Sequence, residues 1–459
     1  MKIPVRPPDI DGIVVAALAA GRHSPLGRAI FDRHLGPAPG GKYRHWDNFR
    51  HLHGDDGLTA EQRWAAVKLA RRQLYVSTPL TDKRGHHFQY ALPAIAVDLL
   101  HRVDRDASGV IGAPEQVTNR HTQTTYRLTS VIEEAIKSSQ LEGAATTRRV
   151  ARDMLLSGRE PEDRSERMIA NNYRALQYVR EHRAEPITAS RVFELQEILT
   201  TGTLDEPDGA GRFRRRDEQI VIEDETGTLL HDPPDARELA VRLDRLCEFA
   251  NGGEGGAREF MHPVVRAILV HFGIGYDHPF VDGNGRTARA LFYWVMAREG
   301  YWLCEYLAIS RILKKGRARY TRSFLYTETD DNDATYFVLH QLDVLNRAIA
   351  DLHSYLAAKA TELREVDDLV RHSRSLRTDL NVRQLALLTH ALKNPHAEYT
   401  IASHRRAHDV AYGTARADLY AMAKRKLLEQ RRRRRAFIFV APADLKQRLQ
   451  GHSRSAHRG

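Results

Sequence analysis

The sequence predicts a mainly α-helical protein that contains one small β-hairpin and ends in a winged helix-turn-helix domain. Apolar residues recur at helical spacing through most of the chain between about residue 125 and residue 300. Residues 218–230 break this pattern with β-branched residues on both sides of a turn. From residue 381 onwards, three short helical patterns precede a basic run and a strand-like segment. Together these three patterns predict the fold class.

The composition is that of an ordinary globular protein, with 42% hydrophobic and 28% charged residues. No run of about eighteen apolar residues occurs, so we expect no membrane span and no membrane partner. The first ten residues lack the apolar core of a secretory signal, and the chain has only two cysteines, so we expect a cytoplasmic protein without disulfides. The net charge of +11 favours anionic partners. An arginine-rich proteome is the alternative explanation of that charge.

Helical patterns dominate the first 360 residues. Residues 1–120 are predicted to be a helical extension, in which Thr59 is suited to cap a helix over residues 60–72. A second domain is predicted over residues 121–360, and it opens with a helix that ends at Gly143. An apolar stripe from Ala288 to Met296 predicts a buried helix that ends near Gly300. Further helices are predicted over residues 149–156, 165–181, 189–200, 236–250 and 261–275.

The predicted hairpin lies between two of these helices. Ile220, Val221 and Ile222 suit one strand, and residues 228–230 suit the return strand. Thr226 and Gly227 suit the turn between the strands, and two prolines close the segment.

The last domain is predicted over residues 375–459. Helices are expected over residues 382–393, 400–408 and 414–426, followed by five arginines and a strand at residues 437–440. This order is typical of a winged helix-turn-helix domain, in which Arg416 and Tyr420 would lie on the recognition helix. A solvated charge run is the alternative explanation of the arginines. We therefore hold DNA as one partner of this domain, and a partner protein as the other.

A twelve-residue stretch, HPFVDGNGRTAR at residues 278–289, concentrates polar groups between two predicted helices. Gly283 and Gly285 allow main-chain N–H groups to point at one place. The helix that starts near Asn284 presents unpaired N–H donors at its N-terminus, which is a common anion site. Arg286 and Arg289 are three residues apart, so they share a helix face, and guanidinium groups suit phosphate oxygens.

Two further groups extend this anion site into a site for chemistry. Asp282 is a lone carboxylate, and one carboxylate with substrate phosphates is how proteins usually hold Mg²⁺. His278 could remove a proton from an attacking hydroxyl. Taken singly, each residue has a structural explanation, but the coherent set indicates phosphoryl or nucleotidyl transfer. The stretch is neither a Walker loop nor a dinucleotide-binding fingerprint, because the lysine motif is absent and a helix precedes it.

The stretch resembles, in full, the signature HPFx[DE]GNGRxxR of Fic domains. The resemblance implies a Fic-type helical bundle and the transfer of AMP from ATP, with Mg²⁺, to a hydroxyl of a target protein. It implies that His278 is the general base and that Asp282 holds the metal. Phe280 would be a core anchor. The residues implied to contact the phosphates of ATP are Gly283, Asn284, Gly285, Arg286 and Arg289.

Three more segments are similar to this family. The hairpin with Ile220, Val221 and Ile222 resembles the flap that docks a target segment. The sequence SSQLEG resembles the inhibitory motif [ST]xxxE[GN] of the subgroup that carries it before the Fic core, with Ser138 opening the motif and Glu142 paired with Arg289. A helix that simply ends in Glu-Gly is the alternative. Residues 318–337 resemble the segment that borders the adenine, although Tyr320 is followed by Thr321 where many relatives have a second tyrosine. The segment KYRHWDNFR resembles an extension that such proteins often carry.

Three functions follow from these observations. The preferred one is a self-inhibited protein adenylyltransferase that modifies a Ser, Thr or Tyr hydroxyl. The first alternative uses the same site to hydrolyse AMP from a modified protein, with Glu142 positioning a water molecule. The second is a DNA-binding regulator in which the site senses nucleotide. The target protein, its modified residue and the oligomeric state stay open, with a homodimer among the alternatives.

Overall fold

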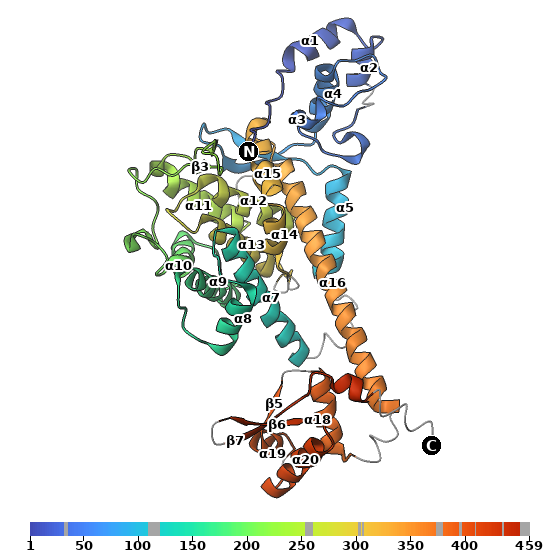
Figure 1. Ribbon diagram of the computed structural model, residues 1–459. Coiled ribbons are helices and arrows are strands. Elements are labelled where there is room, and N and C mark those ends of the chain that lie inside the picture. Colours follow the sequence, from blue (N-terminus) through green and yellow to red (C-terminus); the bar gives the residue numbers. More distant parts are fainter. Residues whose placement is uncertain are drawn as a thin grey trace. The chain divides into compact units, whose positions relative to one another are not determined.

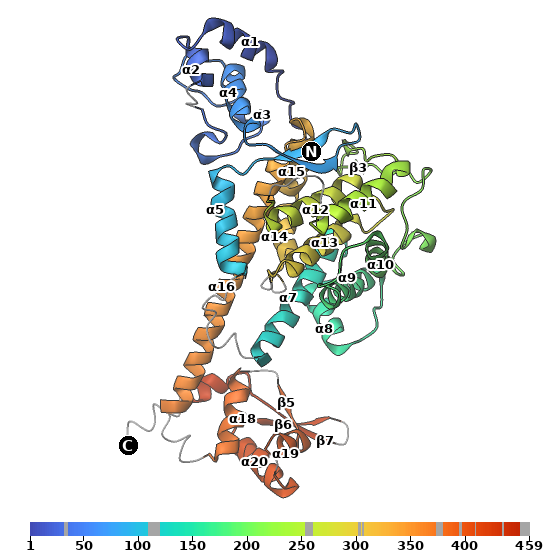
Figure 2. The same cartoon turned by 180° about the vertical axis from the view of Figure 1, so that it is seen from behind.

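The fold is known from a computed structural model of the chain (Figures 1 and 2). The structure describes residues 1–31, 35–108, 120–252, 260–301, 304, 307–372, 380–393, 397–408, 410–433 and 436–449. The chain divides into two compact units, Met1–Leu352 and His353–Gly459. None of the helices within the described ranges is long and apolar enough to cross a membrane.

The N-terminal part of the first unit consists of short helices and a β-hairpin. Its main helix covers the predicted residues 60–72, and Thr59 forms a capping box with Gln62 at its start. The hairpin was not predicted, because Pro79 interrupts its first strand in a way that argues against a strand. The elements are α1 (Asp11–Ala20), α2 (Pro25–Phe31), η1 (Pro39–Gly41), α3 (Trp46–Phe49), α4 (Ala60–Arg72), β1 (Val76–Thr81), β2 (His87–Tyr90), α5 (Ala94–Val103) and η2 (Asp104–Ser108).

A buried ion pair joins this N-terminal part to the rest of the unit. The Lys68 Nζ on α4 lies 2.5 Å from the Asp330 Oδ1, and both side chains are almost fully buried. Asp330 directly follows helix α15, which borders the site described below. The extension therefore supports one wall of that site.

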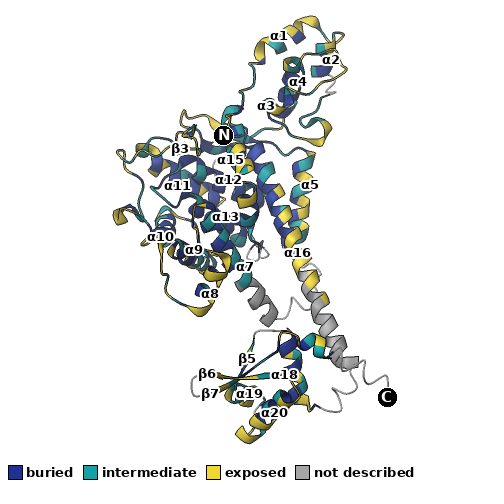
Figure 3. Cartoon of the chain, in the orientation of Figure 1, coloured by how far each residue is buried: buried dark blue, intermediate teal, exposed yellow. Residues whose placement is uncertain are grey.

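Helices make up most of the remainder of the first unit, and the predicted helices of this region are confirmed within a few residues. Helices α12 and α13 form its centre and are almost entirely buried (Figure 3). Phe272 and Trp294 are among the largest fully buried side chains on this pair of helices. The elements are α7 (Arg120–Leu141), α8 (Arg148–Ser157), α9 (Arg164–Glu181), α10 (Ala189–Thr200), η3 (Pro207–Gly209), η4 (Ala236–Glu238), α11 (Leu239–Ala250), α12 (Pro263–Asp277), α13 (Asn284–Arg298), α14 (Ile309–Lys315) and α15 (Arg317–Thr329). Helix α16 (Thr335–His372) begins in this unit and continues into the second.

The predicted hairpin exists but is shorter than expected. Strand β3 (Ile222–Glu223) pairs antiparallel with strand β4 (Leu229–His231). The expectation that Ile220 and Val221 belong to the strand was wrong. In the register of Ile222 opposite His231, the residue opposite Ile220 would be Pro233, which has no N–H to donate to a ladder.

The second unit contains a helix, a short strand, two helices and a β-hairpin in that order. The elements are α18 (Val382–Lys393), β5 (Glu398–Tyr399), α19 (Ile401–His408), α20 (Tyr412–Lys424), β6 (Glu429–Arg433) and β7 (Ala436–Val440). The three strands form one sheet in the order β5-β7-β6. The three expected helices are confirmed, and the arginine run begins as a paired strand. Arg434 and Arg435 lie outside the described residues. The assignment to the winged helix-turn-helix class stays a prediction.

A buried carboxylate organises the helices of the second unit. Asp418 on α20 accepts hydrogen bonds from the Asn381 amide at 2.8 Å and from the Arg383 Nε at 2.8 Å, and its Oδ2 lies 3.2 Å from the His404 Nε2. Burial acts to raise the pKa of Asp418, but the hydrogen bonds from these three side chains outweigh it and hold the pKa below its usual value. The apolar core around them includes Leu388, with Phe439 from the sheet.

Candidate functional site

The twelve-residue stretch connects α12 to α13, and its backbone is unusual at two positions. His278 ends α12 in the left-handed conformation, with φ 44° and ψ 57°. Its N–H donates to the Ile274 carbonyl at 3.0 Å, and its carbonyl accepts from the Arg214 Nε at 2.9 Å. Gly283 has φ 85°, which suits glycine, and α13 begins at the next residue. The loop therefore turns sharply onto the N-terminus of a helix.

The loop is held in shape by one buried amide side chain. The Phe280 N–H donates to the Asn284 Oδ1 at 2.9 Å, and the Asn284 Nδ2 donates to the Phe280 carbonyl at 2.7 Å. Phe280 is fully buried, as expected for a core anchor. The Asn284 amide is thus engaged with the loop backbone, whereas the sequence suggested a direct contact with phosphate.

A cavity of about 240 Å³ opens above this loop. Its walls come from α7, both flap strands, α12, the loop with the start of α13, and α15. Within it lie most of the residues singled out in the sequence, while Arg286, Ser138, Ile220 and Val221 are outside its lining. The lining residues are Leu141, Glu142, Ile222, Leu230, His231, Gly275, Tyr276, His278, Val281, Asp282, Gly283, Asn284, Gly285, Arg289, Arg317, Tyr320, Thr321, Phe324, Leu325 and Glu328.

The ring of His278 is prepared to accept a proton. Its Nδ1 lies 3.2 Å from the Gly275 carbonyl oxygen, which can only accept, so Nδ1 carries the proton and Nε2 keeps its lone pair. Burial lowers the pKa of His278 to about 4, although the Gly275 carbonyl and the charge of Glu142 oppose the shift. The imidazole is therefore neutral near pH 7, which is the state that a general base requires.

Asp282 lies at the mouth of the cavity and is 41% exposed. Its Oδ1 accepts from the Gly283 N–H at 2.6 Å, and its Oδ2 lies 3.0 Å from the Arg286 Nη2. The described ranges contain no group of three or more His, Cys, Asp or Glu side chains that could hold a metal by themselves. A single exposed carboxylate fits the way in which Mg²⁺ is shared between a protein and the phosphates of a nucleotide.

The two arginines of the motif have different surroundings, although they share a helix face. Arg286 is fully buried and turns back toward α10, where its Nη1 donates to the Leu199 carbonyl at 2.8 Å. Together with the contact to Asp282, this makes Arg286 a support for the carboxylate. The sequence suggested that both arginines face the phosphates, but only Arg289 lines the cavity.

Arg289 is bound by the C-terminal end of helix α7. Its Nε donates to the Ser138 Oγ at 2.8 Å, and its Nη2 donates to the Ser138 carbonyl at 3.2 Å and to the Glu142 Oε1 at 2.8 Å. Its buried Nη1 has no hydrogen-bond partner within the described part of the chain. The predicted pairing of Glu142 with Arg289 is thus present in the geometry.

The Glu142 carboxylate lies directly against the N-terminus of α13. A Cβ atom at Gly285 would come within 2.2 Å of the Glu142 Oε1. Only glycine leaves room for the carboxylate at this point. The negative charge of Glu142 therefore occupies the place in which the helix N-terminus would otherwise receive an anion.

Buried polar contacts fix α7 in this position. The carboxylate of Glu134 accepts from the Ser310 N–H at 3.0 Å and from the Ser310 Oγ at 2.5 Å, at the start of α14. One turn further along α7, the Ser139 Oγ donates to the Met168 carbonyl at 3.1 Å. Burial raises the pKa of Glu134 above its usual value, although the bonds from Ser310 oppose the shift.

Tyr320 lines the cavity from helix α15. Its hydroxyl lies 2.8 Å from the His271 Nε2, and its ring packs against Phe324. His271 is fully buried, and burial lowers its pKa to about 3, so this ring stays neutral. Tyr320 and Thr321 both line the cavity, and their contact with an adenine stays a prediction.

Sequence reasoning missed three polar residues at this site. His231 ends the flap strand, and Glu328 is on the last turn of α15. Arg214 supports the His278 carbonyl from a segment without regular structure. A histidine directly before the Asp-Pro-Pro turn at residues 232–234 was the available signal for His231. No local pattern singles out the other two, because their partners are far away in the chain.

Comparisons with known proteins agree with the resemblance. Residues 186–296 match the Fic/DOC family. Over 115 residues the chain is 35% identical to protein adenylyltransferase Fic of Drosophila mojavensis, which covers 25% of this chain and 20% of that protein. Over 233 residues it is 26% identical to protein adenylyltransferase Fic of Nematostella vectensis, which covers 49% of this chain and 51% of that protein. The chain thus spans about half the length of these relatives at most.

Among solved structures, a Fic family protein from Desulfovibrio desulfuricans is 19% identical, with a TM-score of 0.48 over 76% of this chain and 96% of that chain. A Fic domain containing signaling protein from Bacteroides thetaiotaomicron is 18% identical, with a TM-score of 0.45 over 58% of this chain and 97% of that chain. Residues 186–296, which include the signature loop between α12 and α13, thus match the Fic/DOC family, and this mainly helical chain is similar over part of its length to protein adenylyltransferase Fic.

Proposed function

We propose that the protein transfers AMP from ATP to a hydroxyl of a target protein, and that Glu142 restrains this activity. One observation carries the proposal. A neutral His278 with an available Nε2 shares a cavity with the N-terminus of α13 and with Arg289, a cation that has one unpaired nitrogen. A base beside an anion site is what attack of a hydroxyl on a phosphate requires.

Each polar residue of the cavity has its own role in the proposed reaction. His278 takes the proton of a target Ser, Thr or Tyr hydroxyl, and the hydroxyl oxygen forms a bond to the α-phosphorus of ATP. The bond between that phosphorus and the bridging oxygen breaks, and pyrophosphate leaves. The N–H group of Gly285 and the N-terminus of α13 stabilise the charge on the phosphate oxygens, whereas the Gly283 N–H holds the Asp282 carboxylate. Mg²⁺, held by Asp282, would neutralise phosphate charge when it is bound.

The flap and the adenine wall complete the substrate site. Val221 is 47% exposed beside the short strand β3, so a target segment can reach this edge of the flap. Addition of a strand uses main-chain hydrogen bonds and tolerates varied sequences. Ile222 faces the cavity from the same strand, and Tyr320 offers an aromatic surface to the base of the nucleotide.

Glu142 explains how this activity is restrained. Its carboxylate lies where the outer phosphates of ATP would reach the helix N-terminus, and it occupies one nitrogen of Arg289. Nucleotide that enters would have its α-phosphate turned away from in-line attack. Misplacement of a reacting group by about an ångström can slow a reaction roughly a hundredfold.

The experiment for this function uses two labelled nucleotides. The Glu142→Gly variant is incubated with ATP labelled at the α-phosphate or at the γ-phosphate, and protein-bound label is measured. AMP transfer predicts label only from the α-phosphate, and its loss in the Glu142→Gly, His278→Ala double variant. Label from the γ-phosphate would point to phosphorylation instead.

The second unit supports a second function, because it carries the positive charge of the chain. Residues 353–459 contain 22 lysines and arginines against 10 aspartates and glutamates, whereas residues 1–352 contain 48 against 49. We propose that this unit is a winged helix-turn-helix domain that binds duplex DNA. Its helix order and its three-stranded sheet support the assignment.

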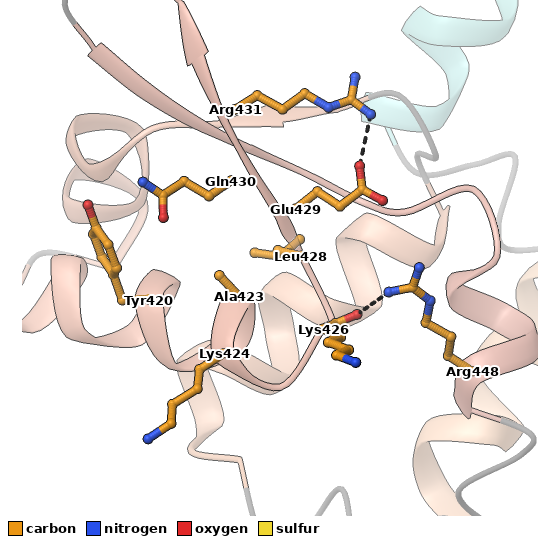
Figure 4. Close-up of a pocket in the computed structure, with 9 residues that line it drawn as sticks. All are labelled: Tyr420, Ala423, Lys424, Lys426, Leu428, Glu429, Gln430, Arg431 and Arg448. Atoms are coloured by element: carbon orange, nitrogen blue, oxygen red, sulfur yellow. Dashed lines mark hydrogen bonds and ion pairs between the residues drawn. The ribbon is translucent and has the colours of Figure 1, made fainter.

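One basic hollow in this unit suits the DNA backbone. It has a volume of about 590 Å³ and lies between the end of α20 and strand β6 (Figure 4). Its only carboxylate among the described lining residues, Glu429, pairs with Arg431 at 2.9 Å. Lys424 and Lys426 line the hollow without an ion-pair partner in the described ranges, so their charges are available for phosphate groups.

A further inference from the structure

One polar cluster at the cavity is not explained by the transfer chemistry. His231, the last residue of flap strand β4, has its Nδ1 2.7 Å from the Glu328 Oε2 and its Nε2 2.7 Å from the Tyr276 carbonyl oxygen. The three residues come from the flap, from the end of α15 and from the last turn of α12. Tyr276 is two residues before His278, so the cluster joins the flap to the backbone that carries the base.

The geometry determines the charge of the His231 ring. A carboxylate oxygen and a carbonyl oxygen can only accept hydrogen bonds, so the ring fills both contacts only when both nitrogens carry protons. A neutral ring would leave one nitrogen lone pair against an oxygen lone pair. Because His231 is buried, water cannot easily replace the lost contact.

Other charged groups around His231 are arranged in pairs. Lys83 lies 2.7 Å from Asp232, and Arg242 lies 2.7 Å from Asp277. Each pair places one positive and one negative charge near the ring, and neutral His278 adds none. Arg214 is a further cation on this side, where it donates to the carbonyls of His278 and Pro234. The Glu328 carboxylate is the negative charge in direct contact with the ring, and it holds the positive charge of the ring. The ring of Tyr276 covers it, with ring centroids 4.7 Å apart.

We propose that His231 is a positioning residue for the target: its doubly protonated ring clamps the flap strand to the end of α12, and thereby sets the docked target hydroxyl opposite the His278 Nε2. This inference rests on the proposed AMP transfer and adds a residue that the signature does not contain. The clamp acts on the target side of the cavity, so it should not alter the binding of ATP.

The clamp depends on pH in a defined direction. Burial lowers the pKa of His231, but the hydrogen bond and the charge of Glu328 outweigh it and raise the pKa above its usual value. A group with a raised pKa in the folded state keeps its contacts below that pKa and loses them as the pH rises through it. Transfer should therefore decline on the alkaline side. Without the carboxylate at position 328, burial and the charge of Lys83 lower the pKa and only the contact with the Tyr276 carbonyl opposes them, so the decline should begin at a lower pH.

The test compares three variants built on the full chain with Glu142→Gly as the parent. These add Glu328→Gln, His231→Gln, or Glu225→Gln as the control, since Glu225 is an exposed carboxylate of the same hairpin without a described partner. Self-labelling from α-³²P-ATP is measured against pH, and the affinity for a fluorescent ATP analogue is measured at the same pH values. The titration of the His231 ring is followed by NMR, with His231→Gln identifying its signal.

The expected results differ between the variants. Glu328→Gln should lower the pKa of His231 and move the alkaline decline to lower pH, with about a tenfold loss of labelling at mildly alkaline pH. His231→Gln should lower labelling at every pH and remove this dependence on pH. Glu225→Gln should follow the parent, and ATP affinity should stay the same throughout.

Two results would overturn the inference while the proposed function stands. One is a Glu328→Gln profile that coincides with an actively labelling parent, and the other is a His231 titration that Glu328→Gln does not change. A parent that fails to label at any pH would instead reject AMP transfer itself, and the positioning role with it.

Discussion

His278 combines an unusual backbone with an unusual environment. Its left-handed conformation directs the ring into the cavity, and the Gly275 carbonyl selects the tautomer with an available Nε2. Histidine is among the residues that tolerate this conformation more readily than most. We predict that His278→Ala keeps the affinity for ATP and loses AMP transfer by about a hundredfold or more. Equilibrium binding and labelling rates in the Glu142→Gly background measure the two effects, and near-parental labelling would exclude His278 as the base.

The low pKa of His278 gives a second prediction at the same residue. The base must be neutral, and burial lowers its pKa to about 4, so the active form persists as the pH falls. Labelling by Glu142→Gly should stay level from neutral pH to about pH 5 and decline only at lower pH, because the loss of the Glu142 charge lowers the pKa of His278 further. A decline centred near the usual histidine value would mean that the ring is more hydrated than its position indicates.

Asn284 belongs to the signature, but its side chain binds the backbone of the loop. Its amide satisfies the N–H and the carbonyl of Phe280, both of which are buried. Asn284→Ala should lower the free energy of unfolding by roughly 1–3 kcal/mol, because two buried groups lose their partners. Urea denaturation measures this, with the exposed Asn48→Ala as the control. Equal costs for the two variants would contradict the role of the amide in the loop.

Some residue roles at the site could be predicted from the sequence, and others could not. The signature identified the loop, the base and the carboxylate, because all of them lie within twelve positions. It did not distinguish Arg286 from Arg289. The difference arises from the Leu199 carbonyl and from Ser138, which belong to helices α10 and α7 and are distant in sequence.

The proposed restraint of AMP transfer depends on helix α7. Glu134 anchors it to the start of α14, eight residues before Glu142. We predict that Ser310→Ala, which removes the hydroxyl partner of Glu134, loosens the helix and raises labelling from α-³²P-ATP. The increase should be smaller than that of Glu142→Gly, because the carboxylate at the cavity remains. An unchanged labelling rate together with a lowered melting temperature would show that the anchor serves stability alone.

The flap hairpin was predicted from the sequence, but the start of its first strand was not. Three consecutive β-branched residues and a turn correctly indicated a hairpin, but the strand was expected to begin two residues too early. The limit came from Pro233 on the other side of the turn, since a proline cannot complete a ladder pair. The arginine run was expected to be the basic part of a wing, but no strand was predicted within it, because its pairing with the apolar strand β7 cannot be recognised from the arginines themselves.

At the scale of the whole molecule, the chain separates an almost neutral unit from a strongly basic one. We predict that the full chain binds duplex DNA and that a chain without residues 375–459 does not. Each phosphate contact should add about 0.9 to the slope of the logarithm of affinity against the logarithm of salt concentration. Equal affinities of the two chains, or the absence of binding by the full chain, would assign the second unit to another partner.

The whole-molecule organisation was only partly accessible from sequence. Helical periodicity indicated a helical body and a separate basic end, since both are local properties. The attachment of the N-terminal helices could not be predicted from the sequence. It depends on the buried pair of Lys68 and Asp330, whose positions are 262 residues apart in the chain.

The contact between Glu142 and Arg289 links the restraint of α7 to the chemistry of the cavity. We predict that Glu142→Gly incorporates label from α-³²P-ATP at least about ten times faster than the wild type. Arg289→Ala should not reproduce this gain, and the double variant should resemble Arg289→Ala, because the arginine is also needed for productive binding of ATP. If Glu142→Gly labels no faster than the wild type across a range of ATP concentrations, Glu142 is only the end of a helix, and the restrained transferase is contradicted.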